Sequence, residues 1–442
     1  MGGHLSGRGG QTGLLLADAG LSRTPAGRLR VAQAELEDIA RAVGTPAYVY
    51  NAEVMRRRYA ELDQAFAAVP HRIHYAVKAN ANLAVLRLFR DLGAGADIVS
   101  IGEGARCLAA GFNPVDLVFS GVGKTAEELE QAARLDLGSI NVESLEELDT
   151  LGGIASRLAR TVRIGIRFNP DVTADTHPYI STGQSGIKFG IPADQVADAV
   201  ALVRAHPRLE LVTIAIHIGS QILDVGPYQD GARRLVDLLT AVRLAGVTTI
   251  RSVDLGGGLG IRYDDESPPG AADLAAAVLP LLRSLGLAIH LEPGRFLVGS
   301  AGLLLTRVSY RKQSGGKVFV VVDAGMTELV RPSRYGAYHH IVEVDERTGP
   351  ETQADVVGPV CETGDFLAID RPLPPLVPGD LLAVLGAGAY GFVMGSTYNG
   401  RPRPPEVLVE GNRWRVVRRR ETIEELYAGE SADGFPHPSR DP

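Results

Sequence analysis

Short apolar runs alternate with helical stretches rich in Ala, Leu and Arg between Tyr48 and about Arg295. The strand candidates are 73–78, 96–100, 117–120, 139–142, 162–168, 211–218, 250–255 and 287–292. The helical stretches between them include 82–92, 102–111, 125–136, 144–159, 193–205, 228–245 and 271–286. Strands and helices that alternate in this way over roughly 250 residues are typical of a parallel barrel. The pattern therefore predicts an α/β fold with a (β/α)₈ barrel, also called a TIM barrel.

The pattern changes after about residue 299. The apolar runs Leu303–Tyr310, Val318–Asp323, Asp380–Leu385 and Glu406–Glu410 are separated by Gly/Pro turns and carry little helical periodicity. Such runs predict a second, C-terminal antiparallel β domain. Both ends of the chain are polar or rich in glycine, so we expect them to be flexible. The predicted units are a flexible N-terminal tail (1–22), the barrel (44–298), the β domain (23–43 with 299–428) and a flexible C-terminal tail (429–442).

Composition narrows the choice of partners and compartment. The chain has 442 residues and a net charge of -7, which argues against nucleic acid or an anionic membrane as the main partner. We find no apolar run of about 18 residues and no secretory leader, which predicts a cytoplasmic protein. Cys107 and Cys361 are too few for a disulfide framework, and no Cys/His cluster has the spacing of a metal site.

Lys78 is the first candidate for chemistry. In the run Ile73–Asn80, Ile73, Tyr75 and Val77 alternate with a second set that ends in Lys78. The larger apolar set would face the helices, and Lys78 would point into the barrel at the C-terminal end of its strand. A lysine among apolar neighbours loses its proton more easily and can form a Schiff base with a carbonyl cofactor. The alternative is an ordinary solvated lysine at a strand end.

Two more inward-facing residues follow from the same alternation. His217 shares one strand face with Thr213 and Ala215, and Glu292 alternates with His290. If the carbonyl cofactor at Lys78 carries a pyridine ring, a carboxylate that faces the ring nitrogen would keep this nitrogen protonated. The ring would then be a stronger electron sink. A hydrogen-bonded core histidine and a structural ion pair are the alternatives for these two residues.

Glycine loops follow the last two barrel strands. Gly256, Gly257 and Gly258 form one loop, and Gly294 lies in the next, within Glu292–Arg295. Glycines let backbone N–H groups approach an anion closely. The loops after strands seven and eight of barrels are a recurring phosphate site, and together they predict one opposite Lys78.

The β domain offers further candidates. Cys361 could donate a proton and Glu362 could bind a substrate ammonium, although an inert thiol is the ordinary alternative for a cysteine. Arg331, Tyr335 and Tyr390 could bind carboxylate or phosphate groups, although loop residues of these types are usually only surface groups.

Several of these segments, in this order along the chain, resemble one enzyme family. They are Tyr75–Asn80, Phe119–Thr125, His177–Gly183, His217–Gln221, Gly256–Gly258, Glu292–Arg295, Asp323–Met326 and the Cys361–Glu362 segment. With them the chain resembles the fold-type III pyridoxal-phosphate decarboxylases, and within that group the diaminopimelate decarboxylase family. The resemblance extends from about Leu36 to Leu426. It implies decarboxylation of meso-2,6-diaminopimelate to L-lysine and CO₂, the last step of lysine biosynthesis.

The resemblance also implies roles for individual residues. Lys78 would form the internal aldimine with pyridoxal 5′-phosphate near Asp97, His217 would stack on the ring, and Glu292 would pair with the pyridine nitrogen. The other cofactor-binding residues implied are Ser220, Gly256, Gly257, Gly258, Gly294, Arg295 and Tyr390. The substrate-binding residues implied are Arg295, Arg331, Tyr335, Glu362 and Tyr390.

Cys361 would come from a partner subunit, which implies a homodimer with shared active sites. Either Cys361 or Lys78 would protonate the carbanion.

Other functions stay open on sequence alone. One alternative is a relative that acts on ornithine, arginine or a carrier-bound glutamyl group. These substrates lack the second α-amino-acid end that Glu362 and the arginines would bind, which argues for diaminopimelate. In the racemases that share the barrel, the pyridine nitrogen typically faces an arginine, so Glu292 argues against them. A non-catalytic cofactor-binding barrel protein is the alternative of another class, and the β domain argues against it.

Overall fold

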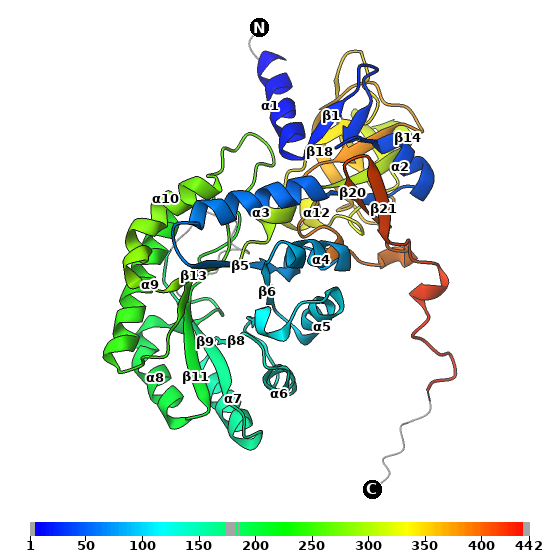
Figure 1. The fold of residues 1–442 in the computed structure, drawn as a ribbon. Helices are drawn as coiled ribbons and strands as arrows, with labels where there is room; N and C mark the ends of the chain where they lie inside the picture. Colours follow the sequence, from blue (N-terminus) through cyan, green and yellow to red (C-terminus); the bar gives the residue numbers. More distant parts are fainter. Residues whose placement is uncertain (1–4, 173–182, 184–185, 436–442) are drawn as a thin grey trace.

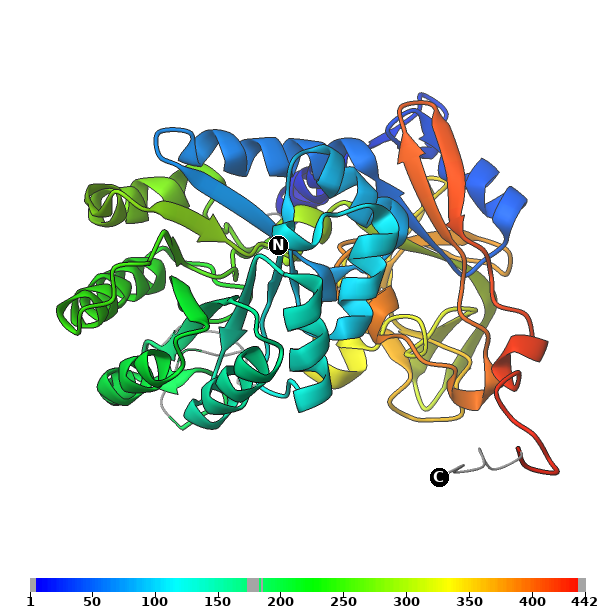
Figure 2. The same cartoon turned by 60° about the horizontal axis from the view of Figure 1, so that its bottom comes forward.

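The computed structural model describes residues 5–172, 183 and 186–435, and the protein consists of a barrel with a β domain beside it (Figures 1 and 2). Residues 177–182 of the His177–Gly183 motif lie outside the described residues. The barrel and the β domain each have a sheet of their own.

Eight parallel strands close the barrel. They are β5 (His71–Ala76), β6 (Gly95–Ile98), β7 (Leu117–Phe119), β8 (Ser139–Val142), β9 (Val162–Asn169), β11 (Leu209–Ala215), β12 (Ser252–Asp254) and β13 (Ala288–Leu291). β13 pairs with β5 and β8 pairs with β9, so the sheet has no open edge between these strands. The short strand β10 (Ile191–Pro192) adds to β9. The predicted (β/α)₈ barrel is confirmed.

Helices surround the barrel strands (Figure 1). They are α3 (Ala52–Phe66), α4 (Leu83–Asp91), α5 (Ile101–Ala110), α6 (Ala126–Leu135), α7 (Leu145–Arg157), α8 (Val196–Ala205), α9 (Gly226–Leu244), α10 (Ala271–Leu282) and α11 (Arg295–Val298). Several begin at a side chain that accepts hydrogen bonds from backbone N–H groups of the first turn, which stabilises the helix start. These N-caps are Asn51, Asn82, Ser100, Thr125 and Ser144.

The β domain is mostly antiparallel. Its strands are β4 (Ala47–Asn51), β14 (Gly302–Ser314), β15 (Lys317–Val322), β16 (Ile341–Glu343), β17 (Thr352–Val357), β18 (Phe366–Leu373), β19 (Leu381–Val384), β20 (Glu406–Glu410) and β21 (Arg413–Arg418). A single helix, α12 (Arg331–Tyr335), lies between β15 and β16. The predicted second, antiparallel β domain is thus confirmed, and within it β15 pairs with β17 in parallel, as does β20 with β4.

β4 corrects the predicted domain boundary. We assigned residues 44–298 to the barrel, but β4 pairs with β14 and β20 in the sheet of the β domain. All five of its residues are buried, and Tyr48 and Tyr50 are completely covered. A short apolar strand near the start of the chain can fill the middle of a distant sheet, and the sequence around it carries no sign of those long-range partners.

The N-terminal segment is also different from the prediction. Residues 1–22 were expected to form a flexible tail, but the structure has α1 (Leu5–Asp18) and β1 (Leu21–Arg23) there. Leu15, Ala19 and Leu21 are buried in an apolar cluster with residues of the β domain. Tertiary burial of this kind outweighs the weak helix propensity of glycine.

The rest of the N-terminal part of the β domain follows α1 and β1. It consists of β2 (Leu29–Val31), β3 (Ala34–Glu35) and α2 (Leu36–Val43). At the other end, residues 429–435 are exposed, and 436–442 lie outside the described residues, so a flexible C-terminal tail stays a prediction.

Candidate active site

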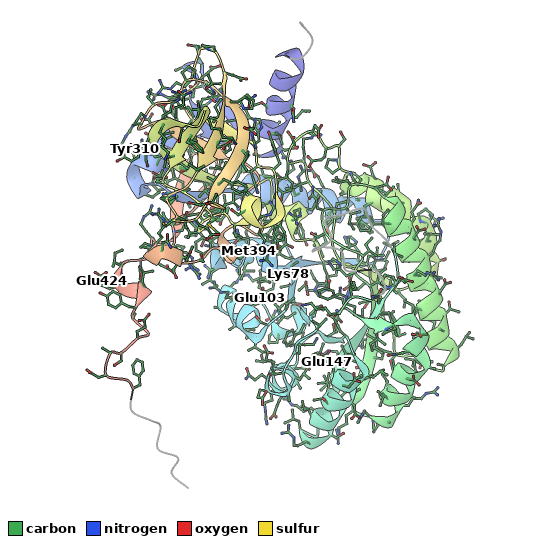
Figure 3. All side chains as sticks on the ribbon, turned by 180° about the vertical axis from the view of Figure 1, so that it is seen from behind. Lys78, Glu103, Glu147, Tyr310, Met394 and Glu424 are labelled. Atoms are coloured by element: carbon green, nitrogen blue, oxygen red, sulfur yellow. The ribbon has the colours of Figure 1, made fainter. Side chains whose placement is uncertain are left out.

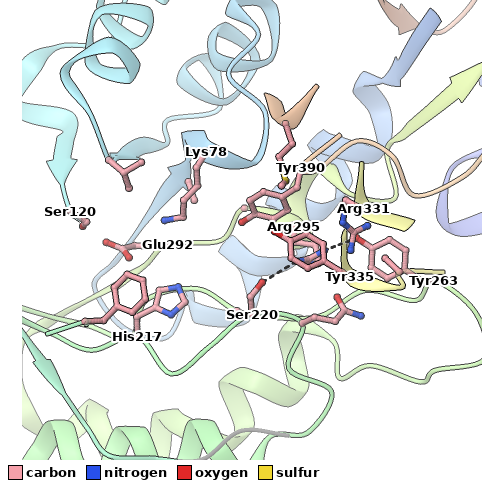
Figure 4. A pocket seen from close by; sticks show the side chains of 18 of the residues that line it. Lys78, Ser120, His217, Ser220, Tyr263, Glu292, Arg295, Arg331, Tyr335 and Tyr390 are labelled. Atoms are coloured by element: carbon pink, nitrogen blue, oxygen red, sulfur yellow. Dashed lines mark hydrogen bonds between the residues drawn. The ribbon is translucent and has the colours of Figure 1, made fainter. Parts of the chain in front are cut away.

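A cavity of about 620 Å³ opens at the C-terminal ends of the barrel strands, where the barrel meets the β domain. Figure 3 shows Lys78 and Met394 at this junction. The barrel contributes Lys78, His217 and Glu292 to the walls, and the β domain contributes residues such as Arg331 and Tyr390 (Figure 4). This is the end of the fold at which barrel enzymes build their active sites.

Lys78 lies just beyond its strand. β5 ends at Ala76, and Lys78 sits in a 3₁₀ turn, η1 (Val77–Ala79). Its Nζ donates a hydrogen bond to Oδ2 of the fully buried Asp97, at 2.7 Å. Burial lowers the pKa of Lys78, but Asp97, Tyr390 and Glu292 together raise it above its ordinary value. The expectation that apolar surroundings would ease its deprotonation is therefore wrong for the free protein, because Asp97 holds the ammonium in place.

Two more buried carboxyl groups, Glu292 and Asp254, lie near Lys78 and Asp97. Burial, Asp254 and Asp97 raise the pKa of Glu292 well above its ordinary value. Burial also raises the pKa of Asp254 to about 6, with Asp97 adding to the effect. Glu292 lines the cavity, and its Oε1 has no hydrogen-bond partner among the described residues. This carboxyl group can therefore hold a proton and offer it to a ring nitrogen.

His217 lies two residues beyond β11 and lines the same cavity. The backbone N–H of Gly219 donates to its Nδ1 at 3.3 Å, so Nδ1 carries no proton. Burial, together with Arg167 and Lys78, lowers the pKa of His217 well below its ordinary value. The imidazole is thus neutral, and a neutral planar ring can stack on an aromatic cofactor.

The predicted glycines have two different environments. Gly258 and Gly294 line the cavity, whereas Gly256 and Gly257 are buried behind it. A Cβ added to Gly257 would lie 2.2 Å from the carbonyl oxygen of Glu292, so this glycine is needed for close backbone packing. Gly258 has a φ of 103°, a conformation that favours glycine.

The far end of the cavity is cationic. Arg295 and Arg331 are 6% and 7% exposed, and Tyr335 lines the wall beside them. Arg295 Nη2 donates to Ser220 Oγ at 3.1 Å, and its guanidinium lies 4.9 Å from the ring centroid of Tyr390. Figure 4 shows this group on one side of the cavity, with Lys78 and Glu292 on the other.

Tyr390 joins the β domain to the lysine turn. Its backbone N–H donates to the carbonyl oxygen of Ala79 at 2.9 Å, one residue beyond Lys78. Asn80 Nδ2 donates to the carbonyl oxygen of Gly388 at 3.2 Å. These bonds fix the two domains relative to each other beside the cavity.

Two predicted site residues lie away from the cavity. Cys361 and Glu362 are exposed and are not among the described residues that line it. Within a single chain the backbone N–H of Cys361 donates to Asn399 Oδ1, and its thiol lies too far out to take part in chemistry in the cavity of the same chain. The other cysteine, Cys107, is buried, and burial raises the pKa of its thiol to about 12.

Sequence reasoning missed several cavity residues. Arg167 on β9 is 9% exposed and lines the wall, held by Glu143 at 3.2 Å. In the sequence Arg167 alternates with the apolar residues Ile166 and Phe168, which could have indicated that it faces the inside of the barrel while they face the helices. Tyr263 also lines the cavity, and no alternation marks it because it lies in a loop.

The residues present fit pyridoxal phosphate. They combine an amine at a barrel mouth, a buried carboxyl oxygen without a partner, a neutral imidazole and two glycines in the wall. The cavity volume is ordinary for a cofactor together with a small substrate. Within 5–172, 183 and 186–435, no group of three or more His, Cys, Asp or Glu residues could hold a metal ion. In the same residues, no helix has both the length and the apolar character needed to cross a bilayer.

Comparison with known proteins agrees with this chemistry. Residues 52–299 match the model of the pyridoxal-dependent decarboxylase family, pyridoxal binding domain. The fold and site therefore define a pyridoxal-phosphate-dependent decarboxylase.

The relatives narrow the class. The chain is 48% identical over 396 residues to diaminopimelate decarboxylase from Pseudomonas aeruginosa, covering 90% of this chain and 95% of that protein. The structure of the Helicobacter pylori diaminopimelate decarboxylase with L-lysine matches with a TM-score of 0.86 at 41% identity, covering 89% of this chain and 98% of the other. The M. jannaschii enzyme matches with a TM-score of 0.89 at 34% identity over 95% and 99%. The chain belongs to the diaminopimelate decarboxylase family.

Proposed function

We propose that this protein decarboxylates meso-2,6-diaminopimelate to L-lysine and CO₂ with pyridoxal 5′-phosphate, the last step of lysine biosynthesis. The observation that carries the proposal is one cavity with Lys78 and Glu292 at one end and Arg295 and Arg331 at the other. The family membership supports the same reaction. A cytoplasmic location is part of the proposal, and two free cysteines suit a reducing compartment.

The barrel end of the cavity suits the cofactor. Pyridoxal phosphate, when bound, supplies the electron sink that accepts the electron pair of the broken C–C bond. Lys78 provides the amine that binds its aldehyde, and Asp97 orients that amine. Glu292 would hold a proton at the pyridine nitrogen, and His217 would stack on one face of the ring. Four of the other predicted cofactor residues line the cavity and would hold the phosphate: Ser220, Gly258, Gly294 and Tyr390.

The cationic end suits the non-reacting end of the substrate. Arg295, Arg331 and Tyr335 bind the distal carboxylate, because guanidinium groups form strong hydrogen bonds with carboxylates. Diaminopimelate keeps this carboxylate through the reaction, whereas ornithine has only an amine at the corresponding place. The buried arginine pair therefore favours diaminopimelate over ornithine.

A second copy of the chain completes the site in this proposal. Cys361 and Glu362 are exposed within one chain, where they could reach the cavity of a partner. Either Cys361 of the second copy or Lys78 then delivers a proton to the reacting carbon, and Glu362 of the second copy binds the distal ammonium.

Complementation tests the shared site. Lys78→Ala and Cys361→Ala proteins, each with little activity, are mixed, dissociated and allowed to reassociate. Mixed dimers carry one intact site, so we expect activity to return. If activity stays absent although mass spectrometry detects the mixed dimer, the shared site is refuted.

Product formation tests the reaction itself. Cofactor-loaded protein is incubated with meso-diaminopimelate, L-ornithine or L-arginine, and CO₂ and the amine products are measured. We expect L-lysine and CO₂ from diaminopimelate and little turnover of the others. Higher kcat/KM for ornithine or arginine, or cofactor binding without turnover of any of them, would overturn the proposal.

A further inference from the structure

Tyr263 contacts both arginines of the cavity and has no role in the proposed reaction described above. It is 6% exposed and lines the wall. Arg295 Nη1 donates a hydrogen bond to its phenol oxygen at 2.7 Å. The guanidinium of Arg331 lies 4.7 Å from the centroid of its ring. Figure 4 shows Tyr263 and Arg331 together at the end of the cavity away from Lys78.

The two arginines alone would be an unfavourable pair. Like charges in a buried site repel each other strongly because little water screens them. Tyr263 stabilises each one differently, since its oxygen accepts a charge-assisted hydrogen bond and its ring face attracts a cation. Burial raises the pKa of the Tyr263 phenol, but Arg295 and Arg331 lower it more, which leaves it below its ordinary value. The phenol is therefore electrostatically coupled to both arginines.

Each arginine also has a hydrogen-bond partner of its own. Arg331 Nη1 donates to His339 Nε2 at 2.9 Å, and His339 Nδ1 lies 2.8 Å from the carbonyl oxygen of Leu385. His339 must donate from Nδ1 to that carbonyl, so its Nε2 is free to accept from Arg331. Arg295 is held on its other side by Ser220. Tyr263 is the one of these partners that contacts both arginines.

The loop that carries Tyr263 is anchored at several points. The N–H of Tyr263 donates to Glu266 Oε2 at 2.9 Å, and Gln221 Nε2 donates to the carbonyl oxygen of Ile261 at 2.6 Å. Gln11 on α1 donates to Asp264 Oδ1 at 2.5 Å. The position of the phenol is thus set before any ligand binds, which reduces the cost of ordering the arginines on binding.

We infer that Tyr263 is a positioning residue that holds Arg295 and Arg331 side by side as a preformed receptor for the distal carboxylate of the substrate. This inference rests on the proposed function. Tyr263 then contributes to the preference of the site for ligands that carry the distal carboxylate over ligands that lack it.

The test uses two substitutions at this position and one control. Tyr263→Phe removes the oxygen that accepts from Arg295 and keeps the ring against Arg331, and Tyr263→Leu removes both. Tyr50→Phe is the matched control, because Tyr50 is fully buried and donates to Glu406 Oε1 at 2.8 Å, away from the cavity. Calorimetric titration of the holoprotein with L-lysine and with cadaverine compares one ligand that has the carboxylate with one that lacks it.

Loss of one hydrogen bond to a charged group predicts about a 10-fold weaker affinity for L-lysine in Tyr263→Phe. The KM for diaminopimelate should rise by a similar factor while kcat changes little, and Tyr263→Leu should show the larger effect of the two. Affinity for cadaverine should stay unchanged in both variants, and Tyr50→Phe should leave both ligands unaffected.

Two results would overturn the inference. One is unchanged L-lysine affinity in both Tyr263 variants, and the other is an equal loss for L-lysine and cadaverine, which indicates a merely structural role. Failure of the proposed function looks different, because the wild-type holoprotein itself would then release no CO₂ from diaminopimelate.

Discussion

The two ends of the cavity bury different ionisable groups, with Lys78 and Glu292 at one end and the arginines at the other (Figure 4). Around Lys78 the buried carboxyl groups are Asp97, Asp254 and Glu292, whereas the other end holds Arg295 and Arg331. At the first end, burial and the neighbouring carboxyl groups raise the pKa values of Asp254 and Glu292, so protons are retained close to where the reaction needs them. At the second end, two permanent cations make an anion-binding site. Proton transfer and carboxylate binding are thus assigned to opposite ends of one cavity.

Both ends also store unfavourable electrostatic energy in the free protein. Buried like charges are costly unless a ligand completes their pairing. A ligand that binds only the native state stabilises it by RT ln(1 + c/Kd), where c is the free ligand concentration. Substitutions at the two ends should therefore have different consequences.

Lys78 should show the largest effect. Lys78→Ala removes the amine that binds the aldehyde, so CO₂ release and the cofactor absorbance of the bound aldehyde should both disappear. Lys78→Arg is the matched control, because it keeps a positive charge beside Asp97 but cannot act as a nucleophile. Both variants should be inactive when CO₂ release is measured. Appreciable turnover in either one would contradict the role of Lys78.

Glu292→Gln should mainly affect kcat. The amide keeps the shape of the side chain but cannot hold the proton at the ring nitrogen, and loss of such a proton partner costs about 10²- to 10⁴-fold in rate. KM for diaminopimelate should change little, because the substrate carboxylate binds at the other end of the cavity. Steady-state kinetics measures both values, and a large rise in KM with normal kcat would contradict this assignment.

Arg331→Met should show the opposite split. Its removal takes away a charged partner of the substrate carboxylate, which predicts a KM about 10- to 100-fold higher. Turnover at saturation should fall much less than in Glu292→Gln. Equal effects of the two variants on kcat and KM would mean that the two ends of the cavity are not separate in function.

The pH dependence of stability should reveal the acidic end in the cofactor-free protein. The pKa of Glu292 is raised well above 4.5 by burial and by Asp254, so the folded state binds this proton more tightly than the unfolded chain does. Stability is then lost as the pH rises from the unfolded-state pKa through the folded-state pKa. Glu292→Gln removes this loss, so the variant should be more stable than wild type at about pH 8, with a smaller difference at about pH 4.5. Thermal unfolding of the wild-type and Glu292→Gln apoproteins at both pH values measures this difference in stability. A stabilising effect that is larger at about pH 4.5 than at about pH 8 would contradict a raised pKa of Glu292.

The smallest effect is expected far from both ends, at α1. Leu15 is 5% exposed and packs on the β domain, so Leu15→Ala should lower the free energy of unfolding by about 2 kcal/mol or more. Its neighbour Leu14 is 53% exposed, and Leu14→Ala should change stability little. Denaturant unfolding compares the two variants. Equal effects would mean that α1 is not docked.

Local pattern predicts most of the barrel and its inward-facing residues. Alternation along the strands is a direct consequence of strand geometry. It pointed to Lys78, His217 and Glu292, which do line the cavity, although each lies one or two residues beyond the end of its strand. It could not identify the place of β4, whose partners β14 and β20 lie hundreds of residues away. α1 was missed because its glycines are poor helix formers, and contacts formed only in the folded protein, such as burial of Leu15 against the β domain, offset that.

Loop residues were hardest to predict. Tyr263 lies in irregular backbone, and nothing in its sequence neighbourhood indicates that it contacts Arg295 and Arg331. Gly256 and Gly257 look like Gly258 in the sequence, but only the third of them reaches the cavity. The difference depends on how the loop packs against Glu292, which is a property of the folded barrel.

The most direct test of the account is to locate the covalent link to the cofactor. The holoprotein is treated with borohydride to make the link permanent, digested, and mapped by mass spectrometry over all five lysines of the chain. The account predicts one pyridoxyl group, on the peptide that contains Lys78, and none on Lys124, whose side chain is 1% exposed. Labelling at another lysine, or full activity in protein that carries no label at Lys78, would contradict it.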